Sequence, residues 1–113
     1  MIRFLKRLFG NYPIIERDNM NRITYFASGN GYWEKSKYND VGLKIYWETS
    51  NNFWSKQVFD SNNNRTHYTN SCGSWIIIEY DEHGNKIHYE NSKGFCHNWK
   101  YDSNSNLINN SRC

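Results

Sequence analysis

The chain has 113 residues, which is the length of a single domain. Its net charge of +3 falls well short of the basic excess expected of a dedicated nucleic-acid binder. Only 37% of the residues are hydrophobic, but 18% are aromatic, so a small core built from large rings is feasible.

The N-terminal stretch MIRFLKRLFGNYP predicts a short helix, because its apolar residues fall on one side of a helical wheel. Gly10 and Pro13 would end this helix. The stretch is too short and too interrupted by charge for a signal peptide or a membrane span. We expect residues 1–22 to form a cap helix and a linker, with the helix covering an apolar sheet face. A cationic interfacial helix is the alternative. Its secondary basic site would be Arg3, Lys6 and Arg7.

A period of 21 residues runs through residues 23–107. One column of the repeat holds an aromatic residue that is followed by Asp or Asn: Tyr38, Phe59, Tyr80 and Tyr101. Other columns hold Trp33, Trp54, Trp75 and Cys96, and Ser50, Ser71 and Ser92. Several columns in register indicate a structural repeat.

Each unit predicts two strands separated by turns. IHYEN and FCHNWKY are short and rich in aromatic residues, as strands are. DEHGN and NSKG supply the Asp, Asn, Ser and Gly residues that favour turns. The chain is therefore predicted to be all-β. We expect an antiparallel meander of about eight short strands from four repeats, followed by a C-terminal tail over residues 108–113.

Turn lengths predict which side chains share a face. A hairpin closed by NSKG would place Tyr89 opposite Cys96 and His88 opposite His97, and a three-residue EHG loop would place Ile78 opposite His88. The predicted core face holds Ile23, Tyr25, Trp33, Ile45, Trp47, Trp54, Val58, Tyr68, Trp75, Ile77, Ile87, Tyr89 and Cys96. The second face is the predicted partner-binding surface: Tyr46, Phe59, Tyr80, Trp99 and Tyr101, with Lys86 and Arg65.

Cysteine and histidine residues predict neither a disulfide nor a metal site. The three cysteines are an odd number without a C-x-x-C pair, which favours reduced thiols in a cytosol. His67 and His88 are repeat-equivalent, so they would lie about 9–10 Å apart on alternate strands. Only His88 and His97 would then lie close together. We expect no metal and no cofactor.

The unit also resembles a known repeat family. Tyr80-Asp81-Glu82-His83-Gly84-Asn85, and the Tyr101-Asp102-x-x-x-Asn106 segment that follows Ser92 and Gly94, are similar to the YD repeats of the Rhs family. The resemblance covers residues 23–107 and implies a β-repeat architecture. Large Rhs proteins use many such units to enclose a toxin, which four units cannot do, so the resemblance implies the fold and not the activity.

The function predicted from these features is binding without catalysis. The sequence has no phosphate-binding glycine loop, no G-x-S-x-G elbow and no HExxH motif, so we do not expect an enzyme. We expect a cytoplasmic protein-binding module of a bacterium or an infected cell. By analogy of size with anti-CRISPR proteins, it would be a phage-encoded inhibitor of a bacterial defence nuclease complex. One alternative is single-stranded nucleic-acid (RNA) binding, against which the acidic residues on the second face count. The other is a structural fragment of an Rhs-like array. The acidic residues are Glu34, Glu48 and Glu90.

Overall fold

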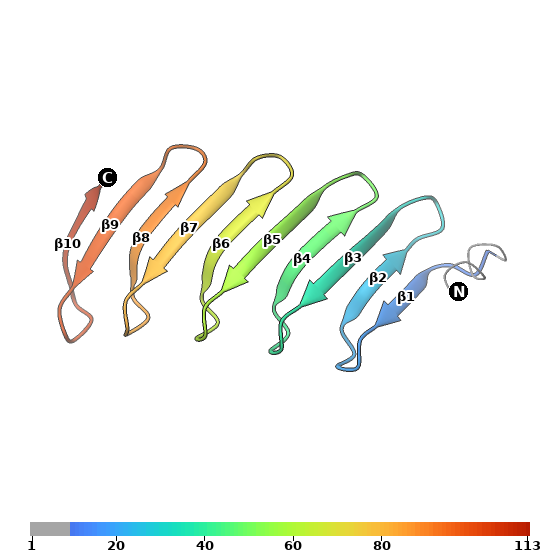
Figure 1. Ribbon diagram of the computed structural model, residues 1–113, viewed down its shortest axis with the longest axis horizontal. Helices are drawn as coiled ribbons and strands as arrows, with labels where there is room; N and C mark the ends of the chain where they lie inside the picture. Colours follow the sequence, from blue (N-terminus) through green and yellow to red (C-terminus); the bar gives the residue numbers. More distant parts are fainter. Residues whose placement is uncertain (1–9) are drawn as a thin grey trace. The chain divides into compact units, whose positions relative to one another are not determined.

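The computed structural model describes residues 10–113, which contain ten β-strands and no helix. The strands follow one another in chain order as an antiparallel meander (Figure 1). Their bounds are β1 Ile14–Arg17, β2 Ile23–Ala27, β3 Trp33–Tyr38, β4 Lys44–Thr49, β5 Trp54–Phe59, β6 Arg65–Asn70, β7 Trp75–Tyr80, β8 Lys86–Asn91, β9 Cys96–Tyr101 and β10 Leu107–Arg112. None of the described elements is a helix long and apolar enough to cross a membrane.

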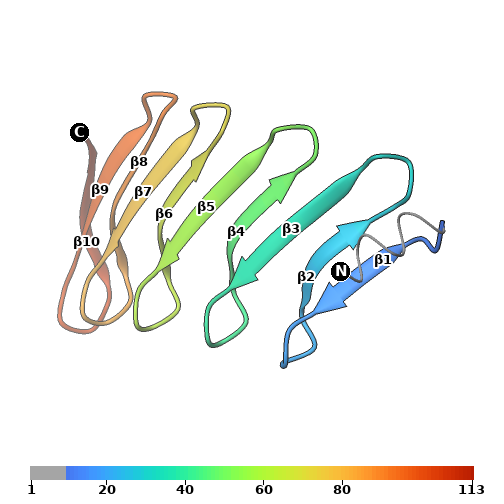
Figure 2. The same cartoon turned by 45° about the vertical axis from the view of Figure 1, so that its right-hand side comes forward.

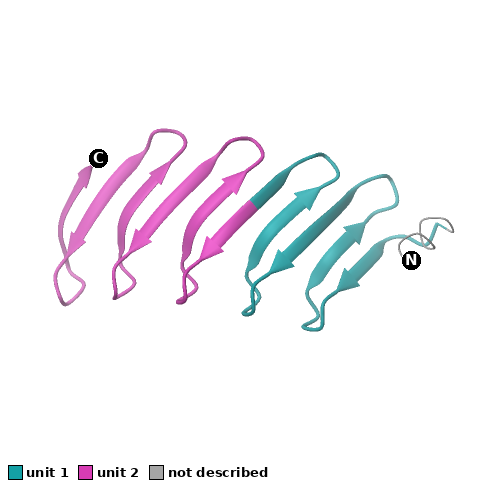
Figure 3. Ribbon diagram, in the orientation of Figure 1, with its two compact units in different colours: residues 1–55 teal, residues 56–113 magenta. Residues whose placement is uncertain are grey.

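The chain divides into two compact units, residues 1–55 (unit 1) and residues 56–113 (unit 2), which Figure 3 colours separately. Each is described by itself. Unit 1 contains β1–β4 and the start of β5, and unit 2 contains the rest of β5 and β6–β10. Within unit 2, β6–β10 form a single layer, which Figure 2 shows from a second direction. Both sheet faces of unit 2 are therefore formed by strand side chains without a second layer from the same unit.

The all-β meander is confirmed, but the prediction of about eight strands is wrong. The two additional strands are β1, which lies in the predicted linker, and β10, which extends into the predicted tail. The polar sequence of β10 carries no hydrophobic alternation, and backbone pairing with β9 alone makes it a strand. The predicted cap helix and its basic residues Arg3, Lys6 and Arg7 lie outside the described residues.

Turns at one end of the hairpins share one construction. In each, an Asp or Asn side-chain oxygen accepts backbone N–H groups from the second and fourth residues that follow, as Asp81 Oδ1 does from His83 at 2.9 Å and Asn85 at 2.8 Å. The residue before the last position has a positive φ, for example 84° at Gly84 and 66° at Asn63. The turn-initiating residues are Asp18, Asn39, Asp60, Asp81 and Asp102. The turn predicted at DEHGN is therefore confirmed, with Asp81 as its first residue.

These bonds lower the carboxyl pKa of the turn aspartates. For Asp18, Asp60 and Asp102 the largest cause is the backbone N–H donated by the fourth residue that follows. At Asp81 the largest single cause is burial, which raises the pKa. The hydrogen bonds donated by Asn85 and His83 together outweigh it, so the net shift is downward. All four carboxyl groups therefore favour the charged form in the folded chain.

Acid should destabilise the chain through these turns. A carboxyl pKa that is lower in the folded chain than in the unfolded chain stabilises the fold above the unfolded-state pKa, and this contribution is lost as pH falls through the folded-state values. We expect the melting temperature to fall steeply below about pH 4. The double variant Asp60→Asn, Asp102→Asn should show a shallower fall, whereas Glu82→Gln, which removes an exposed turn charge, should keep the parent's slope. Equal slopes in all three chains would contradict this account.

The register of the hairpins differs from the prediction by one residue. Tyr89 lies opposite His97, Glu90 lies opposite Cys96, and Ile78 lies opposite Tyr89. The cause is an additional residue at each end of β8. Gly94, at φ 88°, lies in the turn closed by Asn91 and Phe95, and Ile87 is bulged out of the pairing with β7.

A shift of one residue reverses the face of every side chain on a strand. Trp75 and Ile77, predicted to share a core face with Tyr68 and Tyr89, therefore lie on the opposite face. Ile78 is the one buried hydrophobic side chain among residues 56–113. The predicted core residues of this part of the chain are half-buried or exposed: Val58, Tyr68, Trp75, Ile77, Ile87, Tyr89 and Cys96.

The hydrophobic core of unit 1 is a small cluster beside β1. Ile14, Tyr25 and Ala27 are 1%, 3% and 4% exposed, and Tyr12 and Trp33 pack against them. The register places Ala27 opposite both Ile14 and Trp33, so these side chains share one face. The predicted core positions of Tyr25 and Trp33 are thus confirmed, whereas Ile14 and Ala27 were not predicted.

Candidate binding face

Unit 2 carries aromatic and basic side chains together on one face of its sheet, which we call the cationic aromatic face. Its position follows from the register: Tyr68 lies opposite Ile76, Tyr89 lies opposite both Ile78 and His97, and Tyr80 lies opposite Lys86. Its members are Arg65, Tyr68, Tyr80, Lys86, Tyr89, Phe95, His97, Trp99 and Tyr101.

Two of its cations lie over aromatic rings. The Arg65 guanidinium carbon is 5.5 Å from the centre of the Tyr68 ring, and Lys86 Nζ is 5.5 Å from the centre of the Tyr89 ring. Tyr80 donates its hydroxyl hydrogen to the backbone oxygen of Arg65 at 3.1 Å. These contacts repeat at a spacing of 21 residues and hold the positive charges beside the rings.

A continuous run of rings crosses from β8 to β9. The ring centres are 5.6 Å apart for Tyr89 and Phe95, 6.2 Å for Phe95 and His97, and 4.7 Å for His97 and Trp99. Phe95 is 45% exposed, and His97 and Trp99 are half-buried. The run therefore offers a partner accessible aromatic surface.

The glutamates of the unit 2 strands lie on the opposite face. Glu79 is opposite His88 and Glu90 is opposite Cys96, on the side away from Tyr89. The expectation that Glu90 shares a face with Trp99 is therefore wrong. The cause is the same one-residue shift in strand register that moved the predicted core residues. Within residues 56–113, the strands place no carboxylate on the cationic aromatic face.

Most of the predicted partner-binding residues lie together. Arg65, Tyr80, Lys86, Trp99 and Tyr101 share the cationic aromatic face. Tyr68 and Tyr89 were missed, because the predicted register put them on the other side. A cation lies three residues before each of these tyrosines, at Arg65 and Lys86, and this spacing is the signal that could have revealed them. The bulge at Ile87 brings Lys86 and Tyr89 onto one face, and Arg65 lies over Tyr68 in the same way.

Phe59 and Tyr46 are the other two predicted binding residues. Phe59 is half-buried at the end of β5, in the repeat position of Tyr80. Tyr46 belongs to unit 1 and lies opposite Lys37, whose Nζ is 5.6 Å from the ring centre. The register of β3 with β4 puts Tyr46 on the face of Trp33, away from Tyr38, so the prediction that Tyr46 and Trp33 lie on opposite faces is wrong.

A disulfide joins Cys96 to Cys113, which overturns the expectation of reduced thiols only. The two Cα atoms are 5.3 Å apart and 17 residues apart in sequence, and Cys72 is free and exposed. The pairing was missed because β10, which carries Cys113 back to the start of β9, was not predicted. The backbone N–H of Cys113 also donates to the carbonyl of Cys96 at 3.3 Å.

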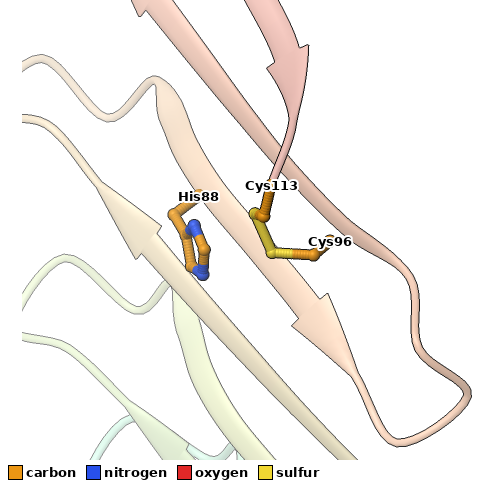
Figure 4. A group of neighbouring side chains, drawn as sticks. All are labelled: His88, Cys96 and Cys113. Carbon is orange, nitrogen blue, oxygen red and sulfur yellow. A yellow bond between two sulfur atoms is a disulfide. The ribbon is translucent and has the colours of Figure 1, made fainter.

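His88 lies beside this disulfide, on the face opposite the aromatic run (Figure 4). It lies opposite Asn98. The sequence predicted a position opposite His97, and that prediction is wrong. Its Nδ1 lies 2.6 Å from Asn98 Oδ1, and its Nε2 lies 3.4 Å from Glu90 Oε1. The bond to Asn98 is the largest cause of a raised His88 pKa, which burial opposes and the neighbouring glutamates support.

Searches with protein-family models and against curated proteins each found no match to this chain. The similarity to YD repeats therefore rests on the repeat columns and turn residues of the sequence alone.

Proposed function

We propose that the protein is a binding module without catalytic activity, and that the cationic aromatic face of unit 2 binds an acidic surface of a partner protein. The observation that carries this proposal is the position of the strand carboxylates of unit 2. Arg65, Lys86 and the ring run lie on one face of residues 56–113, whereas Glu79 and Glu90 lie on the other, which also carries Lys100.

The composition of the face fits protein recognition. Tyr, Trp and Arg dominate the binding energy of interfaces, and Tyr80, Trp99 and Arg65 lie together here. Arg65 and Lys86 add positive charge that would favour an acidic partner and steer its association. That this partner is a nuclease complex of a bacterial defence system stays a prediction, as does a structural role in an Rhs-like array.

Single-stranded nucleic acid is the second candidate ligand. The acidic residues on the predicted face counted against it, but in unit 2 the strand glutamates lie on the opposite face. Stacking rings flanked by cations are what such binders use, with bases on the rings and phosphates on the cations. The ring run from Tyr89 to Trp99 supports this alternative.

Removing two rings from this face should abolish most of the binding. For the double variant Tyr80→Ala, Trp99→Ala, we expect a loss of at least about 2 kcal/mol of binding free energy, or about 30-fold in Kd. The matched control is His67→Ala, Trp75→Ala, which removes one tryptophan and one smaller ring from the opposite face. The partner is captured on the immobilised chain from lysate with and without nuclease, identified by mass spectrometry, purified and titrated. Circular dichroism checks that both variants are folded.

The same titration separates the two ligand classes. For Arg65→Glu, Lys86→Glu, association with a protein should slow modestly. Affinity for single-stranded nucleic acid should instead fall strongly and depend less on salt. If a folded Tyr80→Ala, Trp99→Ala variant binds the purified partner as the parent does, recognition does not use this face.

A further inference from the structure

The C-terminal part of unit 2 gathers three metal-binding side chains on the face opposite the aromatic run. Ligand atoms of His88 on β8, Cys96 on β9 and Cys113 after β10 all lie within 4.8 Å of one another. Figure 4 shows the His88 ring beside the two sulfur atoms. Glu90 lies opposite Cys96, and its Oε1 is 3.4 Å from His88 Nε2. Two sulfurs and one imidazole nitrogen thus converge, and the Glu90 carboxylate lies beside the imidazole.

The Asn98 side chain orients two of these groups. Its Oδ1 can only accept, so His88 Nδ1 donates across the 2.6 Å separation, and the lone pair of neutral His88 is then on Nε2. Its Nδ2 donates to Cys113 Sγ at 3.4 Å. A ligating histidine whose other ring nitrogen is fixed by a hydrogen bond is typical of metal sites.

The repeat shows that the units before β9 do not carry this set. Cys96 takes the position of Trp75, and Cys113 takes the position of Ser92, whose Oγ accepts the backbone N–H of Trp75 at 3.1 Å. The equivalent of His88 one unit earlier is His67, where the corresponding neighbours are Trp75 and Ser92. Both neighbouring columns therefore change to cysteine together, at Cys96 and Cys113.

We propose that the reduced chain binds Zn²⁺ through Cys96, Cys113 and His88, with Glu90 as the oxygen ligand. A disulfide would hold the last hairpin closed under oxidising conditions, and zinc would hold it closed under reducing ones. Two thiolates, one imidazole and one carboxylate form a tetrahedral set that suits zinc. This proposal is independent of the proposed binding function, because the site lies on the other face.

The change between the two states balances with a low-molecular-weight thiol as the reductant. Two molecules of this thiol break the Cys96–Cys113 bond and become one external disulfide, and the protein gains two thiol groups. Zinc then displaces the two thiol protons, which are released to solvent. Affinity should therefore fall as pH is lowered.

Cobalt titration of the reduced chain tests the site. In a Cys72→Ser background, which removes the exposed third thiol, Co²⁺ should give tetrahedral d–d bands and thiolate charge-transfer bands that saturate at one equivalent. Zn²⁺ should bleach both. The oxidised form of the same chain should show neither kind of band. This control leaves the residues of the site unchanged. Asn98→Ala should weaken binding about 10–100-fold.

Matched histidine variants identify the nitrogen ligand. His88→Gln should weaken Co²⁺ binding more than Asn98→Ala does, whereas His67→Gln, its equivalent one unit earlier, should bind as the parent does. Absence of d–d bands in the reduced chain, or equal bands in the reduced and oxidised chains, would overturn the proposal. Equal effects of the two histidine variants would overturn the assignment of His88.

Discussion

A chain whose Cys96–Cys113 disulfide has been reduced in the presence of a metal chelator should unfold at a clearly lower urea concentration than the oxidised chain. The bond closes a segment of 17 residues, and cross-linking a loop of this length stabilises a protein by about 3 kcal/mol through the unfolded state. Every residue of β10 is exposed, so the strand has little burial to hold it once the bond is open. The measurement is urea unfolding of both forms followed by circular dichroism.

Amide hydrogen exchange should show which strands lose stability when the disulfide is reduced. Amides of β10 should lose protection on reduction, while those of β6 and β7 should change little, because local opening begins where few buried contacts hold a strand. Cys72→Ser is the control, since Cys72 is a free thiol outside the bond, and it should unfold as the parent does. Equal unfolding midpoints for the reduced and oxidised chains would show that the bond does not support the hairpin.

Tyr25→Ala should destabilise unit 1 by about 3–5 kcal/mol, the usual cost of removing a large aromatic ring from a core. Tyr25 is 3% exposed and lies in the cluster with Ile14 and Ala27, so its removal leaves a cavity that the short β1 strand cannot fill. Thermal or urea unfolding of the variant measures the loss.

The control is Tyr46→Ala, which removes the same side chain from a half-buried position on the same face of unit 1. It should cost clearly less than Tyr25→Ala. Equal losses would mean that the cluster beside β1 is not the main core of this unit.

The turns could be predicted from sequence because their chemistry is local. Asp60, Asp81 and Asp102 each bond backbone N–H groups within four residues, so the residue type and the 21-residue spacing were sufficient. β10 could not be predicted in the same way. Its only reason to be a strand is pairing with β9, which a polar segment does not reveal.

The grouping of Tyr80 and Trp99 on one face was predicted because two errors in the register cancel. The bulge at Ile87 shifts the register by one residue, and the positive-φ Gly94 shifts it by one more. Tyr80 precedes the bulge and Trp99 follows the Gly94 turn, so the two shifts cancel between them and they remain on one face. Tyr89 lies between them and changes sides. A bulge is visible only in the hydrogen-bond pattern of paired strands, so sequence spacing alone could not place Tyr89.

The distribution of contacts has a consequence for how such a protein can change in size. Within each unit, the substantial contacts join strands that are adjacent in the chain. The disulfide closes only the last hairpin, and the turn from Asp60 to Asn64 has the same construction as that from Asp81 to Asn85. Gene duplication of the segment from Asp60 to Tyr80 would therefore add one hairpin and leave the hairpin that the disulfide closes unchanged. The area of the sheet surface could thus increase in evolution by one whole hairpin at a time.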